Sequence, residues 1–331
     1  MDHEAKANEL AERYSKTLET VFFPEDIFSN DIVNYFASLL RISGYEGEGW
    51  DPYLESKGIL EDLTKLINID LPQEHFTEIV LTRWRLALIF YSHAVEMDAI
   101  YEILTNLLRF KLGKGYSPNP YSLFLTEKQK SKKTNLYPTD KIQIIKTLSK
   151  EAGLEEVGKL FDEFYNGKLR NAISHSDYII AENNFRCRNG GGLNEFQISL
   201  SELNDIILKT KIFIFTFFDL HEEARKVFGK FKNKVKPYEP HYKGLMEILV
   251  DDKDLMCGFK IHWPNNSEAY YRRTEKGCRM VNMWCDVKNS KITLWVDLKA
   301  EKPGNFSPLV EHDKLPIYSK LDSGEIPAWI F

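Results

Sequence analysis

Leu169-Arg170-Asn171-Ala172-Ile173-Ser174-His175 puts a permanent cation, an amide and a titratable imidazole on one short predicted helix. Successive helical residues are about 100° apart, so four polar side chains share one broad face: Arg170, Asn171, Ser174 and His175. The apolar residues of the stretch lie on the opposite face and can anchor the helix. Asn171 and His175 are four residues apart, so the amide can fix the direction and tautomer of the ring. The spacing predicts a helix anchored by one face, with the other face free for chemistry.

Helical periodicity continues through the first two thirds of the chain. A long helix is expected to begin at Pro72 and end near Gly113, enough to run the height of a bundle. Directly after His175, Tyr178–Ile180 and Phe185–Arg188 predict a hairpin, and the run Gly190–Gly192 supplies a further turn. Other helices are predicted at residues 3–23, 25–42, 51–70 with an interruption at Gly58, 139–152, 154–165 after Gly153, and 200–229 opened by a Ser199/Glu202 capping box.

The composition changes after the last of these helices. Pro237 and Pro240 interrupt the chain, and residues 245–331 are rich in Trp, Tyr, Val and Ile. Alternation over residues 291–298 is typical of a strand. We therefore predict a helical domain at residues 1–236 and a small β-rich, or α+β, domain of unknown role at residues 237–331.

Size and charge exclude several classes of protein. The chain has 331 residues, 43% hydrophobic and 28% charged, which fits a globular protein. The net charge of −5 argues against indiscriminate coating of nucleic acid but permits a local basic cleft. The amino terminus is polar, and the most apolar run, residues 212–218, is too short to span a bilayer, so we expect no membrane association. The cysteines, which show no zinc-knuckle spacing, are expected to be reduced thiols in a cytoplasmic protein: Cys187, Cys257, Cys278 and Cys285.

The segment 169–175 resembles the signature of the HEPN superfamily, in which an Arg and a polar residue precede a His by a few positions. The long upstream helix, the hairpin after His175 and a last long helix opening at Ile198 resemble that family too. The resemblance covers roughly residues 72–230. It implies an up-and-down helical bundle, usually a homodimer whose two Arg/His pairs face each other. Many members are metal-independent ribonucleases in phage defence, toxin–antitoxin pairs or RNA processing, and others only bind RNA, nucleotides or proteins.

Two further roles come from the same resemblance. An acidic residue on the long helix often lies near the Arg/His pair, which makes Glu96 a candidate neighbour of that site. In some toxins of the family a partner nucleotidyltransferase modifies a Tyr two residues after the His. Here Tyr178 comes three residues after His175, a departure from that spacing. The expected partners are RNA, a second copy of the chain and an antitoxin or other regulatory protein.

The polar face is suited to cleaving RNA, which carries its own nucleophile in the 2′-hydroxyl. His175 can accept a proton from that hydroxyl or donate one to the leaving 5′-oxygen, and two copies in a dimer can divide the roles. Arg170 can grip the phosphate, and Asn171 can orient the imidazole or donate to the phosphate. This chemistry gives 2′,3′-cyclic phosphate and 5′-hydroxyl ends and needs no metal or cofactor.

A purely structural reading of the same residues stays open. Arg170 can pair with a carboxylate at a helix interface, and His175 can be a C-terminal helix residue favoured by the helix dipole. The sequence then describes a non-catalytic RNA- or nucleotide-binding module, or a regulatory dimer subunit.

Other polar clusters have similar pairs of interpretations. His93, Glu96 and Asp98 offer few ligands for a metal and read more simply as a solvated or interface face. One basic run can line an RNA path or simply be a solvated helix end that leads into a linker: Arg225, Lys226, Lys230, Lys232, Lys234 and Lys236. A second basic cluster lies in the long loop, which can be functional or disordered: Lys128, Lys130, Lys132 and Lys133. The tail residues Trp263, Tyr270, Tyr271, Arg272 and Arg273 can contact nucleic acid, although such aromatics usually form the core of a small β domain.

Overall fold

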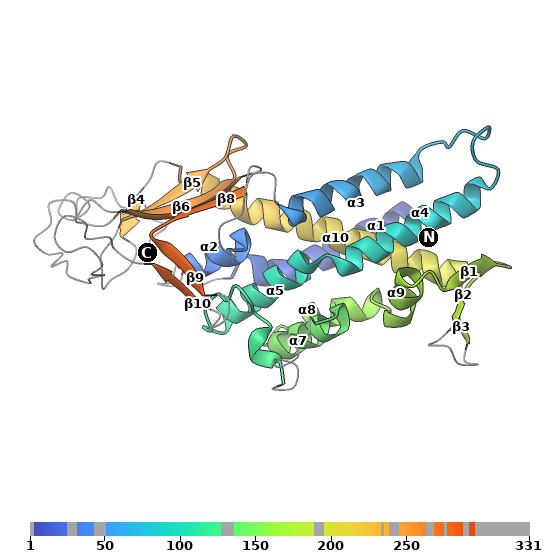
Figure 1. The fold of residues 1–331 in the computed structure, drawn as a ribbon, viewed down its shortest axis with the longest axis horizontal. Coiled ribbons are helices and arrows are strands. Elements are labelled where there is room, and N and C mark those ends of the chain that lie inside the picture. Colours follow the sequence, from blue (N-terminus) through green and yellow to red (C-terminus); the bar gives the residue numbers. More distant parts are fainter. Residues whose placement is uncertain are drawn as a thin grey trace, which may run out of the picture. The chain divides into compact units, whose positions relative to one another are not determined.

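The computed structural model describes residues 3–24, 32–42, 51–126, 136–188, 195–232, 235–237, 245–262, 268–274, 277–286 and 291–294. Within these ranges the chain is mainly helical, with three small antiparallel sheets (Figure 1). This confirms the predicted helical class, with strands confined to the hairpin region and the tail.

The helices follow the predicted periodicity closely in most places. In chain order they are α1 (His3–Phe22), α2 (Ile32–Leu40), α3 (Pro52–Asn68), α4 (Ile79–Glu96), α5 (Asp98–Lys111), the 3-10 turn η1 (Ser122–Phe124), α7 (Pro138–Glu151), α8 (Glu155–Lys159), the 3-10 turn η2 (Leu160–Glu163), α9 (Gly167–Ser174) and α10 (Leu200–Gly229). The predicted capping box at the start of α10 is confirmed, because the backbone N–H of Ser199 donates to the Glu202 carboxylate at 2.9 Å.

Contacts divide the chain into two compact units, and neither is a continuous stretch of sequence. The first comprises Met1–Thr20, Pro52–Tyr101 and Asn135–Asp219. The second comprises Val21–Asp51, Glu102–Thr134 and Leu220–Phe331. Helix α10 contributes residues to both. The domain boundary at residue 236, which falls within strand β4 (Val235–Pro237), stays a prediction.

An aromatic cluster forms the core of the first unit. The Phe161 ring lies 5.1 Å from Phe213, 5.6 Å from Phe164 and 5.9 Å from Tyr101, centroid to centroid. Phe213 and Phe217 of α10 are 1% and 0% exposed, which confirms that the apolar run at residues 212–218 is a buried helix segment. This core joins α5, η2 and α10.

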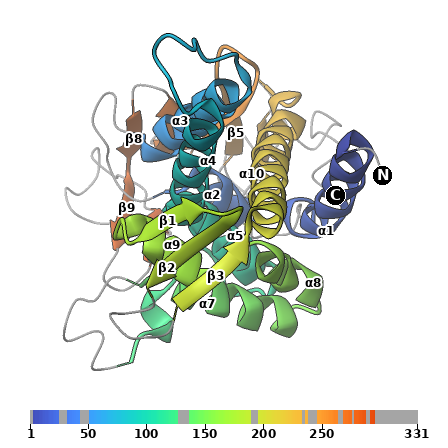
Figure 2. The ribbon, with the colours of Figure 1, turned by 90° about the vertical axis from the view of Figure 1, so that its right-hand side faces the viewer.

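The first unit also holds a three-stranded sheet, β1 (Tyr178–Ala181), β2 (Asn184–Arg188) and β3 (Glu195–Ser199), in that order (Figure 2). The hairpin β1–β2 is confirmed. Its two-residue turn, Glu182–Asn183, has φ of 51° and 61°, as a type I′ turn requires. No sequence pattern indicates strand β3, and because β3 includes Ile198, the last helix begins at Leu200 and not at Ile198. The expected glycine turn at 190–192 lies outside the described residues.

The second unit contains a five-stranded sheet in the order β4-β5-β6-β7-β8 and a two-stranded sheet, β9 with β10. Its remaining strands are β5 (Leu245–Val250), β6 (Met256–His262), β7 (Glu268–Thr274), β8 (Gly277–Val281), β9 (Met283–Asp286) and β10 (Lys291–Leu294). Phe36 of α2 joins helices to this sheet, since its ring lies 4.8 Å from Phe228 and 6.2 Å from Phe259. The β-rich tail therefore packs on α2 and on the end of α10.

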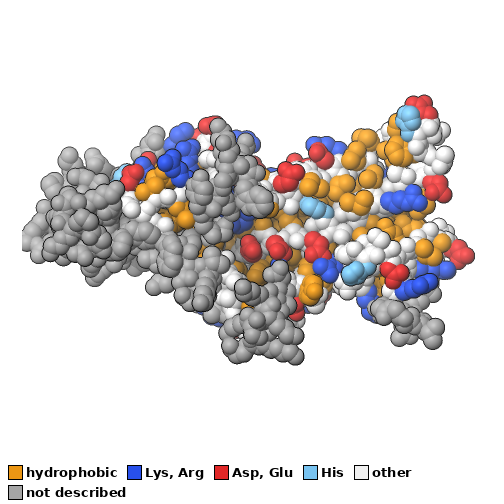
Figure 3. Space-filling view, viewed as in Figure 1, with side chains coloured by type: hydrophobic (Ala, Val, Ile, Leu, Met, Phe, Trp, Pro, Cys, Tyr) orange, Lys and Arg blue, Asp and Glu red, His pale blue; other side chains and the backbone are white. Residues whose placement is uncertain are grey.

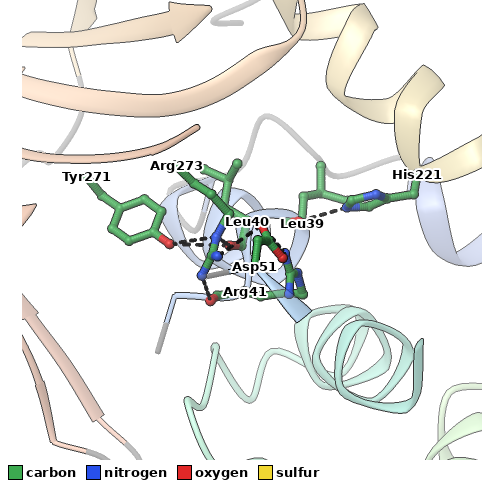
Figure 4. Close-up of polar contacts among 7 residues, drawn as sticks. All are labelled: Leu39, Leu40, Arg41, Asp51, His221, Tyr271 and Arg273. Atoms are coloured by element: carbon green, nitrogen blue, oxygen red, sulfur yellow. Dashed lines mark hydrogen bonds and ion pairs between the residues drawn. The ribbon is translucent and has the colours of Figure 1, made fainter. Parts of the chain in front are cut away.

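A buried polar network closes the C-terminus of α2 in this unit (Figure 4). Arg273 of β7 donates to the Leu40 carbonyl at 2.9 Å, to the Arg41 carbonyl at 3.1 Å and to Asp51 at 3.2 Å. His221 of α10 contacts the Leu39 carbonyl at 2.8 Å. These contacts satisfy carbonyl groups that a helix end leaves without an intrahelical partner. Arg273 and Tyr271, candidates for nucleic-acid contact, are thus buried structural residues.

The single long helix predicted from Pro72 is wrong. The Pro72 carbonyl only closes an isolated turn, accepting from His75 and Phe76 at 3.1 and 3.2 Å, and α4 begins at Ile79. At Met97 the backbone is extended, and the Tyr101 hydroxyl donates to the Val95 carbonyl at 2.8 Å, in place of the helical bond lost there. The expected end near Gly113, where φ is 65°, is confirmed for α5. Helix α3 also runs through Gly58 without the predicted interruption.

Candidate functional site

Helix α9 is held by its N-terminus and by one apolar face. The Asn166 side chain accepts from the backbone N–H groups of Lys168 and Leu169, each at 3.0 Å, and so caps the helix. The Asn166 N–H in turn donates to the Tyr91 hydroxyl of α4 at 2.9 Å. Leu169 and Ala172 are 0% and 5% exposed. The predicted anchoring face is therefore confirmed.

His175 is the C-cap residue of α9. Ser176 follows with φ of 54°, its N–H donates to the Ile173 carbonyl at 3.0 Å, and the Asp177 N–H donates to the Ala172 carbonyl at 2.9 Å. This pair of bonds is the Schellman motif, with serine at the position that glycine usually occupies. Within the described part of the chain the exposed imidazole has no hydrogen-bond partner. The ring is thus open to solvent, at a helix end that favours positive charge.

Arg170 points toward α4. Its Nε–H donates to Glu96, the last residue of α4, and its Nη1–H donates to the Asn171 side-chain oxygen at 2.8 Å. The hydrogen bond to Glu96 raises the pKa of Arg170 above its ordinary value. A guanidinium has five N–H groups, so three remain for a ligand, on an Arg170 side chain that is 15% exposed. The acidic neighbour expected at Glu96 is present.

Asn171 does not bond to the imidazole. Its side-chain oxygen accepts from Arg170, not from the His175 ring, so the expected fixing of the ring by Asn171 is absent from this structure. The physical reason is that the adjacent guanidinium is a charged donor already within reach, and charge-assisted bonds are the stronger ones. Ser174 is exposed, and Tyr178 of β1 stacks on Phe185 with centroids 5.2 Å apart.

The sequence did not point to Tyr137, which precedes α7. The Arg170 guanidinium carbon lies 5.7 Å from the centre of this ring, and Tyr137 is 62% exposed. The two residues are far apart in the chain, and no motif connects them. Only the folded structure, which brings the residue before α7 close to Arg170, shows the pairing.

The cluster His93, Glu96 and Asp98 is not a shared site among the described residues. Glu96 pairs with Arg170, and Asp98 pairs with Lys141 at 2.5 Å. The His93 Nε2 atom is buried without a hydrogen-bond partner in the described part, and burial lowers the pKa of His93. The three side chains therefore have separate surroundings, and the interface reading fits them better than a metal site.

The basic run at the end of α10 belongs to the second unit and is partly neutralised there. Arg225 donates to the Met256 carbonyl at 2.7 Å and to Asp251 at 3.3 Å, and Lys232 pairs with Asp254 at 3.1 Å. Lys226 and Lys230 are exposed. Two of the four proposed RNA contacts thus already have acidic partners. The loop lysines 128–133, Trp263 and Lys234 lie outside the described residues.

A shallow pocket of about 740 Å³ lies where the start of α4 meets the tip of the β1–β2 hairpin. Phe76, Val80, Trp84 and Ile180 supply apolar walls, and Glu182 and Asn183 of the turn supply a polar rim. Apolar side chains also gather over α3 and α4 (Figure 3). The exposed ones on these two helices include Leu54, Ile59, Leu66, Val80 and Ile89, and the segment between the helices adds Ile69 and Phe76.

No protein-family model, curated protein or solved structure matches this chain. Among the helices that the structure describes, none has the length and apolar character to cross a bilayer.

Proposed function

We propose that this chain is a metal-independent endoribonuclease with an HEPN-like helical bundle, acting in the cytoplasm in phage defence or as a toxin. The observation that carries the proposal is the polar face of α9. It bears an always-charged guanidinium with three N–H groups left over and, five residues on, an exposed imidazole at the helix end. The hairpin after His175 and the capped α10 are the further features that support the family resemblance.

The proposed reaction begins with attack of a 2′-hydroxyl on the adjacent phosphorus. His175 of one copy accepts the hydroxyl proton, and the new P–O bond forms as the P–O bond to the 5′-oxygen breaks. His175 of a second copy gives its proton to that oxygen. Arg170 holds the non-bridging oxygens and stabilises the charge that develops on them. The products are a 2′,3′-cyclic phosphate and a 5′-hydroxyl.

This mechanism needs a homodimer, and the exposed apolar side chains of α3 and α4 support one. Contiguous apolar surface on a folded protein commonly marks an interface. In a toxin or defence role an antitoxin or other regulatory protein would restrain the site. The resemblance alone supports that partner.

Cleavage of RNA in excess chelator tests the proposal. We expect Arg170→Ala and His175→Ala to lose at least about 100-fold in rate, the scale of general acid–base and electrostatic contributions. Lys168→Ala is the matched control, because Lys168 is an exposed cation on the same helix. A strand with 2′-deoxyribose should not be cut. Unchanged cleavage by both variants, or equal cleavage of the deoxyribose strand, would refute the assignment.

A second candidate is favoured by one contact. The Arg170–Glu96 ion pair joins α9 to α4, as expected if Arg170 only stabilises a helix interface in a binding or regulatory subunit. In that case Arg170→Ala should lower the melting temperature and weaken dimerisation, and no RNA cleavage should be detected with the unmodified protein.

A further inference from the structure

The Tyr137 ring is conspicuous in the first unit because it is left in solvent. Tyr14, Tyr91 and Tyr101 of the same unit are at most 2% exposed, whereas Tyr137 is 62% exposed. Exposing so much of an aromatic ring gives up the hydrophobic stabilisation that burial provides, about 25 cal/mol for each Å². Folding of this unit therefore does not explain why an aromatic residue stands there.

The backbone at Tyr137 is nevertheless well defined. Its N–H donates to the Asp140 carboxylate at 3.2 Å, and the next residue, Pro138, is buried as the first residue of α7. Thr139, one position further, shares a hydrogen bond of 2.7 Å with the Tyr165 hydroxyl. The ring is thus presented from a fixed helix start.

The Arg170 guanidinium covers only part of the Tyr137 ring. Its guanidinium carbon lies 5.7 Å from the ring centre, within the range of a cation–π contact. A guanidinium can cover one face of an aromatic ring, and the 62% exposure of Tyr137 leaves the remaining ring surface accessible. The site therefore combines a phosphate-binding cation with an adjacent free aromatic surface.

We propose that Tyr137 stacks on the base next to the phosphate that Arg170 holds. Aromatic side chains beside arginines bind unpaired bases in this way, and every base has a face that can stack. The inference rests on the proposed function and adds a residue that positions the substrate. It requires the RNA to be unpaired at the cut, because a base in a duplex is already stacked on both sides.

Binding of an RNA that cannot be cut tests this without relying on catalysis. The probe is a short, fluorescent single-stranded RNA with 2′-O-methyl groups, and the readout is anisotropy with the full chain. We expect Tyr137→Ala to weaken binding roughly tenfold, the value of one stacked base. Tyr137→Phe and Tyr137→Trp should bind as the unmodified protein does. Phe124→Ala, which removes another exposed aromatic ring outside α3 and α4, is the control.

The failures of the two proposals can be told apart. If Tyr137→Ala binds the probe as tightly as the unmodified protein while Arg170→Ala does not, stacking is refuted and the phosphate site stands. If Tyr137→Ala binds weakly but Arg170→Ala and His175→Ala still cut RNA, stacking stands and the catalytic assignment is refuted. Absence of any RNA binding refutes both. Should Tyr137→Ala melt early, Tyr137→Leu decides, since it keeps apolar bulk without an aromatic face and must also bind weakly.

Discussion

Glu96, the last residue of α4, accepts a hydrogen bond from the Nε of Arg170 on α9, although 74 positions separate them in the chain. This contact sets the direction of the guanidinium before any ligand binds. It also places a negative charge beside the group that would attract a phosphate. Glu96 therefore has two opposing effects on the proposed site: it orients Arg170 and it weakens the local positive field.

Two substitutions of Glu96 separate these effects. Glu96→Gln keeps an oxygen that can accept from Arg170 but removes the charge, so we expect kcat to be retained and KM for RNA to fall. Glu96→Ala removes the acceptor, and the loss of a hydrogen bond to a charged group, about 1.5–3 kcal/mol, predicts a roughly 10- to 100-fold loss of kcat/KM. Steady-state cleavage measurements check both. Equal losses in the two variants would contradict the orienting role.

Asn171 offers a test of what the amide contributes. Its side chain accepts from Arg170 at 2.8 Å and makes no hydrogen bond to the His175 ring among the described residues. We therefore expect Asn171→Ala to change KM by less than about tenfold, the scale of one ordinary hydrogen bond, and to leave the pH profile of kcat in place. A displaced pH profile would show instead that the amide orients the imidazole during the reaction.

The local structure of α9 was predictable because its determinants are adjacent in sequence. Asn166 supplies the cap, Leu169 and Ala172 supply the buried face, and the apolar pattern repeats at helical spacing. The hairpin after His175 was predictable for the same reason. The alternation of its strands is local, and the two-residue turn Glu182–Asn183 follows from the pairing of Ala181 with Asn184.

What the sequence could not show depends on contacts between distant segments. The apolar stripe continues past Met97, so periodicity alone does not reveal the break between α4 and α5. The Asn171 oxygen accepts from Arg170 and not from His175, and residue spacing alone does not show which of two partners within reach will form the bond. Tyr137 and Arg170 meet only in the folded chain. Within the second unit, Arg273 of the tail caps α2, which lies more than 200 residues away in the sequence.

Replacing Ser176 with glycine should stabilise the folded protein. Its φ of 54° is a left-handed conformation, which costs a non-glycine residue about 1–2 kcal/mol. Glycine avoids this strain, but fixing its more flexible backbone on folding costs about 0.4–1 kcal/mol more than fixing that of another residue. We expect Ser176→Gly to raise the free energy of unfolding by about 0.5–1 kcal/mol. Thermal and urea unfolding check this. Ser176→Val, with a β-branched side chain, should lower stability, and a gain with valine would contradict the strain argument.

The network at the end of α2 should be sensitive to the loss of one partner. Arg273 and Asp51 have side chains only 8% and 4% exposed, and each also bonds to neighbours of α2. Arg273→Met removes one of the two arginines that pair with Asp51, since Arg41 also donates to Asp51 at 2.8 Å, and it takes a donor from the carbonyls of Leu40 and Arg41. We therefore expect a loss of about 1–3 kcal/mol in the free energy of unfolding. Lys232→Met, which breaks the exposed pair with Asp254, is the control and should cost under about 1 kcal/mol. Equal losses in the two variants would show that burial of the pair is unimportant.

Protonation of the Glu163 carboxylate should lower the free energy of unfolding in acid. Both of its carboxylate oxygens accept from Arg13, each at 2.6 Å, and one also accepts from the Tyr14 hydroxyl at 3.0 Å. The bonds to Arg13 hold the pKa of Glu163 below its ordinary value of 4.5. At pH 7 the carboxylate is ionised in both the folded and the unfolded chain, so the stabilisation is fully present. Below 4.5 the unfolded chain takes up a proton first, and stability declines until the folded carboxyl is protonated as well.

Because the Arg13 side chain is 48% exposed, solvent screening limits the effect to about 1 kcal/mol. Urea unfolding at pH 7 and at pH 3 should show Glu163→Gln less stable than the unmodified protein at the higher pH, with a smaller difference at the lower. Arg13→Met should remove the same pH dependence, and a stability difference that persists unchanged at pH 3 would rule out this assignment.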